Sequence, residues 1–302
     1  MRIESLRVPS IRLRCRSVSV RACACALSGQ FRAVLQASLP LCLSLCLLSA
    51  VHAQTSSTTL EGGVATQDND CVILLHGLAR SARSMKKLAS RLRDAGYRTA
   101  NIDYLSRVYE IPALANLAVE AGLDECRQSG EGRISFVTHS LGGILVRQYL
   151  VNESIPELFR VVMLGPPNQG SEVVDNLRSM PGFALLNGPA GLQLGTGEND
   201  VPRKLGAVNF DLGVIAGTRT INLVLSLYLP NPDDGKVSVE SAKVDGMCDF
   251  LTMPVSHALI MRDDPVIDQV QYYLRAGRFS HDEDDENVVA DQQPRPAHCT
   301  AF

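Results

Sequence analysis

Ser140 is the residue of this chain whose surroundings best suit nucleophilic chemistry. It lies in Thr138-His-Ser-Leu-Gly-Gly143, between a run that reads as a strand, Arg133–Val137, and a run that reads as a helix, Leu141–Asn152. A serine on so tight a strand-to-helix turn projects its hydroxyl outward, and the free N–H groups of the helix start favour negative charge beside it. Serine is also a common helix N-cap, so the turn alone leaves both roles open.

A serine nucleophile needs a base, and His257 is the histidine best placed to be one. It follows the short strand-like run Phe250–Met253 in Pro254-Val-Ser-His257. The other histidines lie in an N-terminal leader, in the C-terminal tail or in turns after other strands: His52, His281, His298, His76 and His139. We expect the two turn histidines to support their turns through hydrogen bonds, which leaves His257 as the general base.

Two further turns complete a possible site. Asn231-Pro-Asp-Asp-Gly-Lys-Val237 follows the strand-like run Val214–Ala216 and presents two carboxylates, Asp233 and Asp234, either of which could orient a histidine. His76-Gly-Leu78 follows the buried run Cys71–Leu75, and its glycine lets a backbone N–H point toward the same edge.

The elements that must position these turns alternate along the chain. Strand-like runs are followed by amphipathic helical segments, which predicts an α/β fold: a mostly parallel sheet of about six strands, right-handed crossovers, and helices on both faces. Functional loops of such a sheet gather at the carboxyl ends of its strands. The expected strands are Cys71–Leu75, Tyr97–Tyr104, Arg133–Val137, Phe159–Leu164, Val214–Ala216 and Phe250–Met253, and the expected helices are Ser81–Gly96, Pro112–Cys126, Leu141–Asn152 and Asp264–Ala276.

Charge is distributed unevenly between the start of the chain and the rest. Residues 1–53 hold seven arginines and one acid, a net charge of +6, so the overall −3 leaves −9 for residues 54–302. The arginines precede an apolar run, Leu39–Ala50, and a small-residue site at Ala53, which is the layout of a signal peptide. We therefore expect an exported protein, periplasmic or secreted, that is cleaved near Ala53. An uncleaved membrane anchor is the alternative, and the true start could lie downstream of Met1.

The rest of the chain divides into three parts. Residues 54–70 are a polar lead-in, residues 71–279 form one α/β domain, and residues 280–302 are an acidic tail that we expect to be disordered. An acidic main part argues against nucleic-acid binding, because phosphate contacts need a basic face.

Four cysteines remain once the leader is removed: Cys71, Cys126, Cys248 and Cys299. In an oxidising compartment they could form two disulfides in three possible connectivities, and the sequence does not choose among them. None has a CxxC or other metal-ligand spacing and the chain has no HExxH motif, so we expect neither a metal nor another cofactor.

In chain order, these segments resemble the α/β-hydrolase superfamily, specifically its small bacterial lipases and esterases. The resemblance spans about residues 71–279. It rests on Val72-Ile-Leu-Leu-His-Gly-Leu78, Phe136-Val-Thr-His-Ser-Leu-Gly-Gly143, Met163-Leu-Gly-Pro-Pro-Asn-Gln-Gly-Ser171, Asp234-Gly-Lys-Val-Ser-Val-Glu240 and Ser256-His257. It implies the α/β-hydrolase fold without the first two antiparallel strands of the superfamily. One position departs from the pattern: Thr138 stands where the family usually has glycine.

The resemblance also implies roles for single residues. Ser140 would be the nucleophile and His257 the base. Asp234 would be the acid rather than Asp233, because it directly precedes Gly235-Lys-Val. The backbone N–H groups of Leu78 and Leu141 would form the oxyanion hole.

The activity that the resemblance implies is that of a serine-dependent carboxylic ester hydrolase, a lipase or esterase that works through an acyl-enzyme. Its substrate would be a small-molecule ester or a lipid, with transient contact to a lipid interface. Two other functions fit the same fold: an acyltransferase, in which an alcohol replaces water, and a non-catalytic binding protein of the cell envelope. The sequence does not give acyl-chain length, oligomeric state or the presence of a lid.

Overall fold

The structure, a computed structural model, describes residues 69–281 and 296–299. The expected leader, residues 1–53, and the lead-in up to residue 68 lie outside the described residues.

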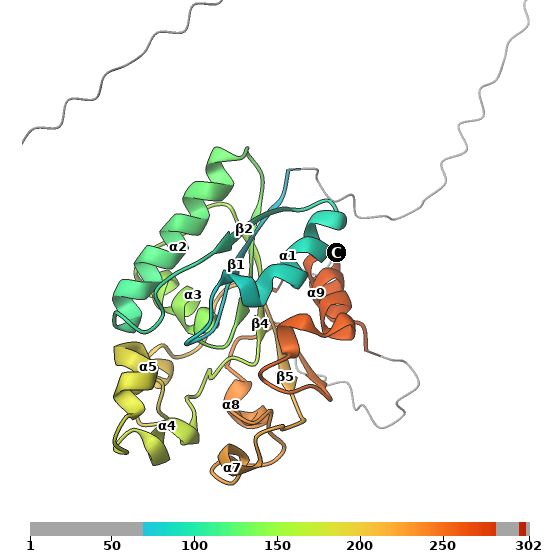
Figure 1. Cartoon of the computed structure of the whole chain (residues 1–302). Coiled ribbons are helices and arrows are strands. Elements are labelled where there is room, and N and C mark those ends of the chain that lie inside the picture. Colours follow the sequence, from blue (N-terminus) through green and yellow to red (C-terminus); the bar gives the residue numbers. More distant parts are fainter. Residues whose placement is uncertain (1–68, 282–295, 300–302) are drawn as a thin grey trace, which may run out of the picture. The chain divides into compact units, whose positions relative to one another are not determined.

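Six parallel strands form one open sheet in the order β2-β1-β3-β4-β5-β6 (Figure 1). Their bounds are β1 Cys71–Leu75, β2 Arg98–Ile102, β3 Ile134–His139, β4 Leu158–Leu164, β5 Leu212–Gly217 and β6 Asp249–Met253. All five neighbouring pairs are parallel, and within residues 69–281 the sheet has no antiparallel member. The predicted α/β-hydrolase sheet is therefore confirmed. Since the strand order reverses beside β1, the loops after β1 and β3 open at a switch point, where α/β proteins form their sites.

Helices cover both faces of this sheet because residues of each strand alternate between two apolar cores. In β1, Ile73 and Leu75 belong to one core, and Val72 and Leu74 to the other. The first core is shared with α2 (Ile111–Gln128) and α3 (Leu141–Asn152). The second is shared with η1 (Ala82–Met85), α1 (Lys86–Asp94), η2 (Ile260–Arg262) and α9 (Asp264–Ala276).

The long connection between β4 and β5 contains three short helices, α4 Glu172–Leu177, α5 Phe183–Leu192 and α6 Val201–Lys204, of which α5 and α6 were not predicted. Glycine and proline interrupt this stretch, and α5 itself is kinked at Gly188, whose φ is +67°. The interruptions hide the helical period that prediction relies on. Two more one-turn helices, α7 (Leu223–Ser226) and α8 (Val239–Ala242), flank the turn at Asp233 and Asp234.

Two disulfides settle the pairing that the sequence left open. Cys71 pairs with Cys126, which joins the start of β1 to the end of α2. Cys248 pairs with Cys299, which joins the start of β6 to the C-terminal segment. The paired cysteines are 55 residues apart in sequence in the first disulfide and 51 residues apart in the second.

The expectation of a disordered tail over residues 280–302 is corrected at the ends of that segment. The backbone N–H of Ser280 donates to Gln269 Oε1 at 2.9 Å, and His281 Nε2 lies 3.1 Å from an oxygen of Asp249. At the other end, His298 Nε2 donates to the Gly246 carbonyl at 2.8 Å beside the disulfide of Cys299. These contacts attach the described residues 280, 281 and 296–299 to the domain, while residues 282–295 and 300–302 lie outside the described residues.

None of the helices in the described part of the chain combines the length and apolar character needed to span a membrane.

Candidate active site

Ser140 is the single residue between the end of β3 and the start of α3. Its backbone has φ +53° and ψ −120°, a conformation that non-glycine residues rarely adopt. Its side chain makes no capping hydrogen bond to the helix, so the N-cap role is not what the structure shows. The backbone N–H of Ser140 donates to the Leu164 carbonyl at 2.9 Å, which fixes the turn against β4.

Two glycines allow the chain to turn so sharply. A Cβ on Gly142 would lie 2.6 Å from the Leu75 carbonyl, and one on Gly143 would lie 2.9 Å from Met163 Sδ. The side chain of Thr138, at the position where the family usually has glycine, is fully buried. Its Oγ1 lies 3.2 Å from the point where a Cβ of Gly143 would sit. Threonine is therefore accommodated because the positive φ falls on Ser140 and because Gly143 has no side chain.

His257 lies within hydrogen-bond distance of Ser140. Its Nε2 is 3.1 Å from Ser140 Oγ, although 117 residues separate the two in sequence. Its Nδ1 is 2.8 Å from Asp234 Oδ2. In the neutral tautomer that suits both contacts, Nδ1–H donates to the carboxylate and Nε2 accepts the serine proton. We call these residues the Ser–His–Asp chain.

The two neighbouring aspartates have different contacts, which resolves the ambiguity of the sequence. Asp234 Oδ2 faces His257, while its Oδ1 accepts from the backbone N–H groups of Lys236 and Val237 at 2.9 and 2.8 Å. Asp233 instead accepts from the N–H of Gly235 at 2.7 Å and from the hydroxyl of Ser226. Asp233 therefore holds the turn, and Asp234 contacts the histidine.

Two glycines behind this pair are part of the site, and sequence reasoning missed them. A Cβ on Gly165, which directly follows β4 and has φ +54°, would lie 2.9 Å from Asp234 Oδ2 and 3.2 Å from His257 Nδ1. A Cβ on Gly217, at the end of β5, would lie 2.8 Å from Asp234 Cβ. The signal was present in the sequence, because each glycine ends or directly follows a strand at the edge where the other site residues lie.

The turn after β1 contacts Ser140 from the opposite side. A Cβ on Gly77 would lie 3.1 Å from the Ser140 Cβ, so only glycine lets this turn come so close. Leu78 follows directly, and Leu141 is the first residue of α3. The first N–H groups of a helix have no partner within it. Leu78, expected to help form an oxyanion hole, therefore directly follows the glycine that contacts Ser140, and Leu141 directly follows Ser140 in the chain.

The two turn histidines are buried in hydrogen-bonded positions, as expected. His139 Nε2 donates to the His257 carbonyl at 3.0 Å, and the two rings are 4.7 Å apart. His76 stacks on Tyr104 with ring centroids 4.0 Å apart. Burial lowers the pKa of both histidines, and for His139 the neighbouring His257 lowers the pKa further. Both rings are therefore neutral near pH 7 and support the turns without charge.

Among the described residues, the one cluster with metal-ligand atoms close together is Cys248, His298 and Cys299. Both sulfurs are already joined in a disulfide, so neither is a thiolate that could bind a metal.

Comparisons with known proteins agree with this fold. The chain has a TM-score of 0.57 and 20% identity to the mature lipase BlEst2 of Bacillus licheniformis, covering 69% of this chain and 93% of that one. For the propeptide form of the same lipase the TM-score is 0.55 at 21% identity, with 68% and 50% covered, so the chain spans half of that form. Aspergillus fumigatus lipase B has a TM-score of 0.50 at 12% identity, covering 69% of this chain and 53% of the other. No curated protein matches the sequence.

A family comparison covers the same region. Residues 72–295 match the family described as the Alpha/beta hydrolase family, a segment that includes all six strands except the first residue of β1. The segment also contains every residue of the Ser–His–Asp chain, as well as Leu78 and Leu141. This protein belongs to the alpha/beta hydrolase family.

Proposed function

We propose that this protein is a serine-dependent carboxylic ester hydrolase of the lipase or esterase class. The observation that carries the proposal is the Ser–His–Asp chain, with its two contacts of 3.1 and 2.8 Å at the carboxyl edge of the sheet. Because three residues far apart in sequence meet in the order that acyl transfer needs, a purely structural role explains the arrangement poorly. The likeness to the lipase structures supports the same class.

In the proposed reaction, Ser140 Oγ attacks the ester carbonyl as His257 Nε2 takes its proton. Asp234 stabilises the imidazolium without taking the proton. The N–H groups of Leu78 and Leu141 stabilise the oxyanion, a contribution of about 3–4 kcal/mol per donor. His257 then passes the proton to the leaving alcohol. In the second half of the reaction, water attacks the acyl group with His257 again as the base, and the acid product leaves Ser140.

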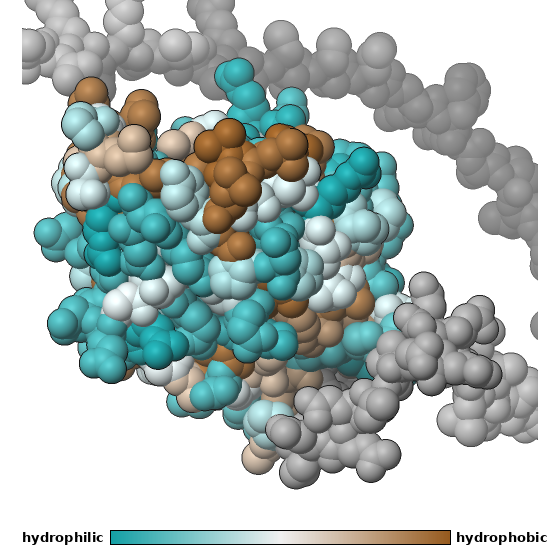
Figure 2. Space-filling view, turned by 90° about the horizontal axis from the view of Figure 1, so that it is seen from below, coloured by the Kyte–Doolittle hydropathy of each residue, from teal (hydrophilic) through white to brown (hydrophobic). Residues whose placement is uncertain are grey.

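An apolar or lipid substrate is supported by the surface around this edge. Figure 2 shows the end of the molecule where α4, α5, α7 and α8 lie in Figure 1, and apolar groups gather in patches on it. Several leucines of α5 and α7 are more than half exposed: Leu185, Leu186 and Leu223, followed in the chain by Leu227. Large exposed apolar patches commonly mark binding surfaces for apolar partners.

The test is active-site labelling of the chain that begins at Gln54. A fluorophosphonate should label Ser140, and Ser140→Ala should lose at least about 1000-fold in kcat on a p-nitrophenyl ester while unfolding at the same temperature. Labelling at another residue, or turnover that survives in Ser140→Ala, would contradict the proposal. Adding an alcohol and measuring ester formation against hydrolysis separates a hydrolase from an acyltransferase.

We also propose that the protein is exported and processed near Ala53. Two disulfides support this location, since such bonds persist in oxidising compartments. N-terminal sequencing of the protein recovered outside the cytoplasm should begin at Gln54, and a mature protein that retains the arginine-rich segment would contradict processing.

A further inference from the structure

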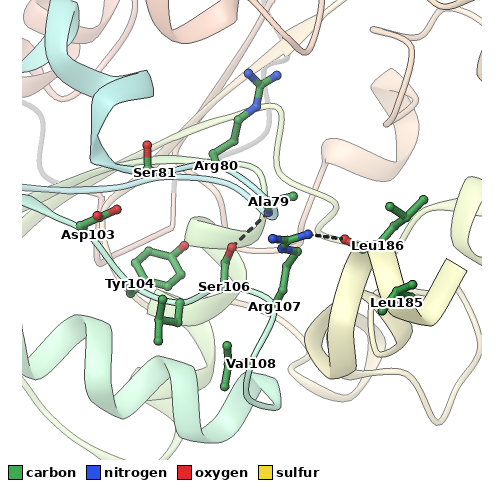
Figure 3. Close-up of a pocket in the computed structure, with 11 residues that line it drawn as sticks. Ala79, Arg80, Ser81, Asp103, Tyr104, Ser106, Arg107, Val108, Leu185 and Leu186 are labelled. Carbon is green, nitrogen blue, oxygen red and sulfur yellow. Dashed lines mark hydrogen bonds between the residues drawn. The ribbon is translucent and has the colours of Figure 1, made fainter. Parts of the chain in front are cut away.

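A pocket of about 680 Å³ opens next to the turn after β1, and the reaction proposed above gives it no role. Three segments line it: the loop after β1, the loop after β2, and α5 (Figure 3). The loops contribute Ala79, Arg80 and Ser81 from the first and Asp103–Val108 from the second, and α5 contributes Leu185 and Leu186.

The pocket lies beside the proposed site, because residues of the turn after β1 contact Ser140 and the residues that follow them line the pocket. Gly77 touches Ser140, as described above, and Arg80 follows three residues later. Since consecutive Cα atoms are 3.8 Å apart, the Arg80 Cα lies within about 11 Å of the Gly77 Cα. On the far side, a Cβ on Gly191 of α5 would lie 3.0 Å from Leu78 Cδ2. Helix α5 therefore packs on the turn after β1 and forms a wall of the pocket.

The two arginines of this pocket carry charge that nothing in the described part of the chain neutralises. Arg80 forms no ion pair there, and Arg107 donates only to the Leu186 carbonyl, at 3.4 Å. Figure 3 shows the two guanidinium groups on opposite sides of Ala79. The one carboxylate of the lining, Asp103, already accepts from the N–H of Ala82 at 3.0 Å and faces His76 at 3.5 Å.

A third cation lies close to Arg80 on the side of the Ser–His–Asp chain. Lys236 follows Asp234 and Gly235 in the acid turn, and it is exposed. Arg80 and Lys236 both lower the pKa of His139, whose ring contacts His257. Positive charge therefore concentrates at this mouth, in a chain whose residues 54–302 carry a net charge of −9, the overall −3 minus the +6 of the leader.

Several other residues of the pocket lining are apolar and exposed. Leu185 of α5 is 84% exposed, and its neighbour Leu186 and the loop residues Leu105 and Val108 are also more than half exposed. A wall of this kind suits a hydrocarbon chain, because covering it removes apolar surface from water. Cations and exposed apolar side chains in one pocket suit a molecule that has both characters.

We propose that this pocket binds ester substrates that carry an anionic group, a carboxylate or a phosphate, together with an apolar chain. Arg80 and Arg107 contact the anion, Lys236 adds to the positive field, and the leucines of α5 cover the chain while the ester carbonyl lies at Ser140. Guanidinium groups suit both anions, since their planar fork matches carboxylate and phosphate oxygens. This substrate class rests on the proposed function and narrows it.

The test compares two pairs of esters, each with one anionic and one neutral member. One pair is mono-4-nitrophenyl glutarate and its neutral methyl ester. The second pair is a lysophosphatidic acid and the monoacylglycerol with the same acyl chain, which distinguishes a phosphate from a carboxylate. For each pair, the measured quantity is the ratio of kcat/KM for the anionic ester to that for the neutral ester. A ratio is unaffected by partial loss of folded enzyme.

In the wild type we expect a ratio above about five for at least one pair. In Arg80→Gln and in Arg107→Gln the ratio should fall about five- to tenfold, because each variant loses one charged hydrogen-bond donor to the anion. Arg80→Glu should favour the neutral ester. Arg83→Gln is the matched control, because Arg83 is an exposed arginine one turn later that does not line the pocket, and its ratio should stay within about twofold of the wild type. Raising the salt concentration should reduce the wild-type ratio through screening.

A wild-type ratio near one for both pairs, or a ratio that the arginine variants leave unchanged, would overturn the pocket proposal. If the neutral esters are still cleaved through Ser140, the proposed function stands without it. If none of the four esters is cleaved, the pocket proposal also fails, and fluorophosphonate labelling of Ser140 then decides the proposed function separately.

Discussion

The two sides of Ser140 are built differently. On the side of β4, β5 and β6, His257 and Asp234 are nearly fully buried, each faces a defined partner, and Gly165 and Gly217 pack directly behind them. On the side of the β1 loop and α5, arginines and leucines are exposed around a pocket.

This difference separates two tasks that one site must combine. Proton transfer needs donor and acceptor held within a few tenths of an ångström, which close packing and the hydrogen bonds of His257 and Asp234 provide. Choosing a substrate needs space, charge and apolar surface that remain open until the substrate arrives. Changes on the packed side should therefore affect turnover, and changes on the open side should affect which ester is preferred.

The sharpest test of the packed side uses the two adjacent aspartates. Asp234→Asn keeps the shape but replaces the acceptor of the His257 proton, so we expect kcat to fall by about 10³–10⁴-fold. Asp233→Asn is the matched control in the same turn. An amide oxygen can still accept from Gly235 N–H, so its loss should stay below about tenfold. Steady-state kinetics on one p-nitrophenyl ester measures both, and equal losses would contradict the distinct roles.

A second test asks how closely the packed side fits. Gly165→Ala places a Cβ 2.9 Å from Asp234 Oδ2 and 3.2 Å from His257 Nδ1, so the pair must shift and kcat should fall by about 10- to 100-fold. Gly206→Ala separates crowding from backbone strain, because Gly206 also has a positive φ, +63°, but nothing within 4 Å of the added Cβ. That control should lose about 1 kcal/mol of unfolding free energy and keep its kcat. A similar loss of kcat in both variants would mean that strain alone is responsible.

The smallest expected effect is on stability, and it comes from the buried histidines beside the packed side. Burial lowers the pKa of His139 and His76 in the folded state, so below about pH 6.5 the unfolded chain binds protons that the folded chain does not. The unfolding free energy should therefore fall as the pH falls below that value, by up to about 1.4 kcal/mol per pH unit for each histidine.

Urea unfolding at pH 7.5 and at pH 5.5 measures this dependence. His139→Asn removes one of the two groups and should show a smaller loss between the two pH values than the wild type. If the variant is as sensitive to pH as the wild type, His139 is not one of the groups responsible.

Much of the fold was predictable because strands and turns leave local patterns. The bounds of β1, α3 and α9 agree with the sequence analysis to the residue. Each is a buried or amphipathic run with a clear signal at one boundary, such as the serine before α3 or Gly277 after α9, which has a φ of +69°. The helices α5 and α6 were not predicted, since glycine and proline interrupt this segment and short helices depend on tertiary contacts, such as the packing of Gly191 of α5 against Leu78.

The site residues were predictable for the same reason, but their division of labour was less so. Ser140 and His257 follow strands, and parallel strands bring their carboxyl ends to one edge. Choosing Asp234 over Asp233 relied on resemblance, because the two are adjacent and chemically identical. Their difference is the direction of each side chain, which depends on the hydrogen bonds of the turn.

By itself, the sequence determined the alternation of strands and helices, the polar turns at their ends and the types of reactive side chain, because all of these depend on neighbours a few residues apart. Only the tertiary structure decided which cysteines pair, which aspartate contacts His257, and that two arginines and a leucine-rich helix enclose a pocket beside Leu78. The reason is that these depend on distances between segments tens to more than a hundred residues apart, and no local pattern encodes such distances.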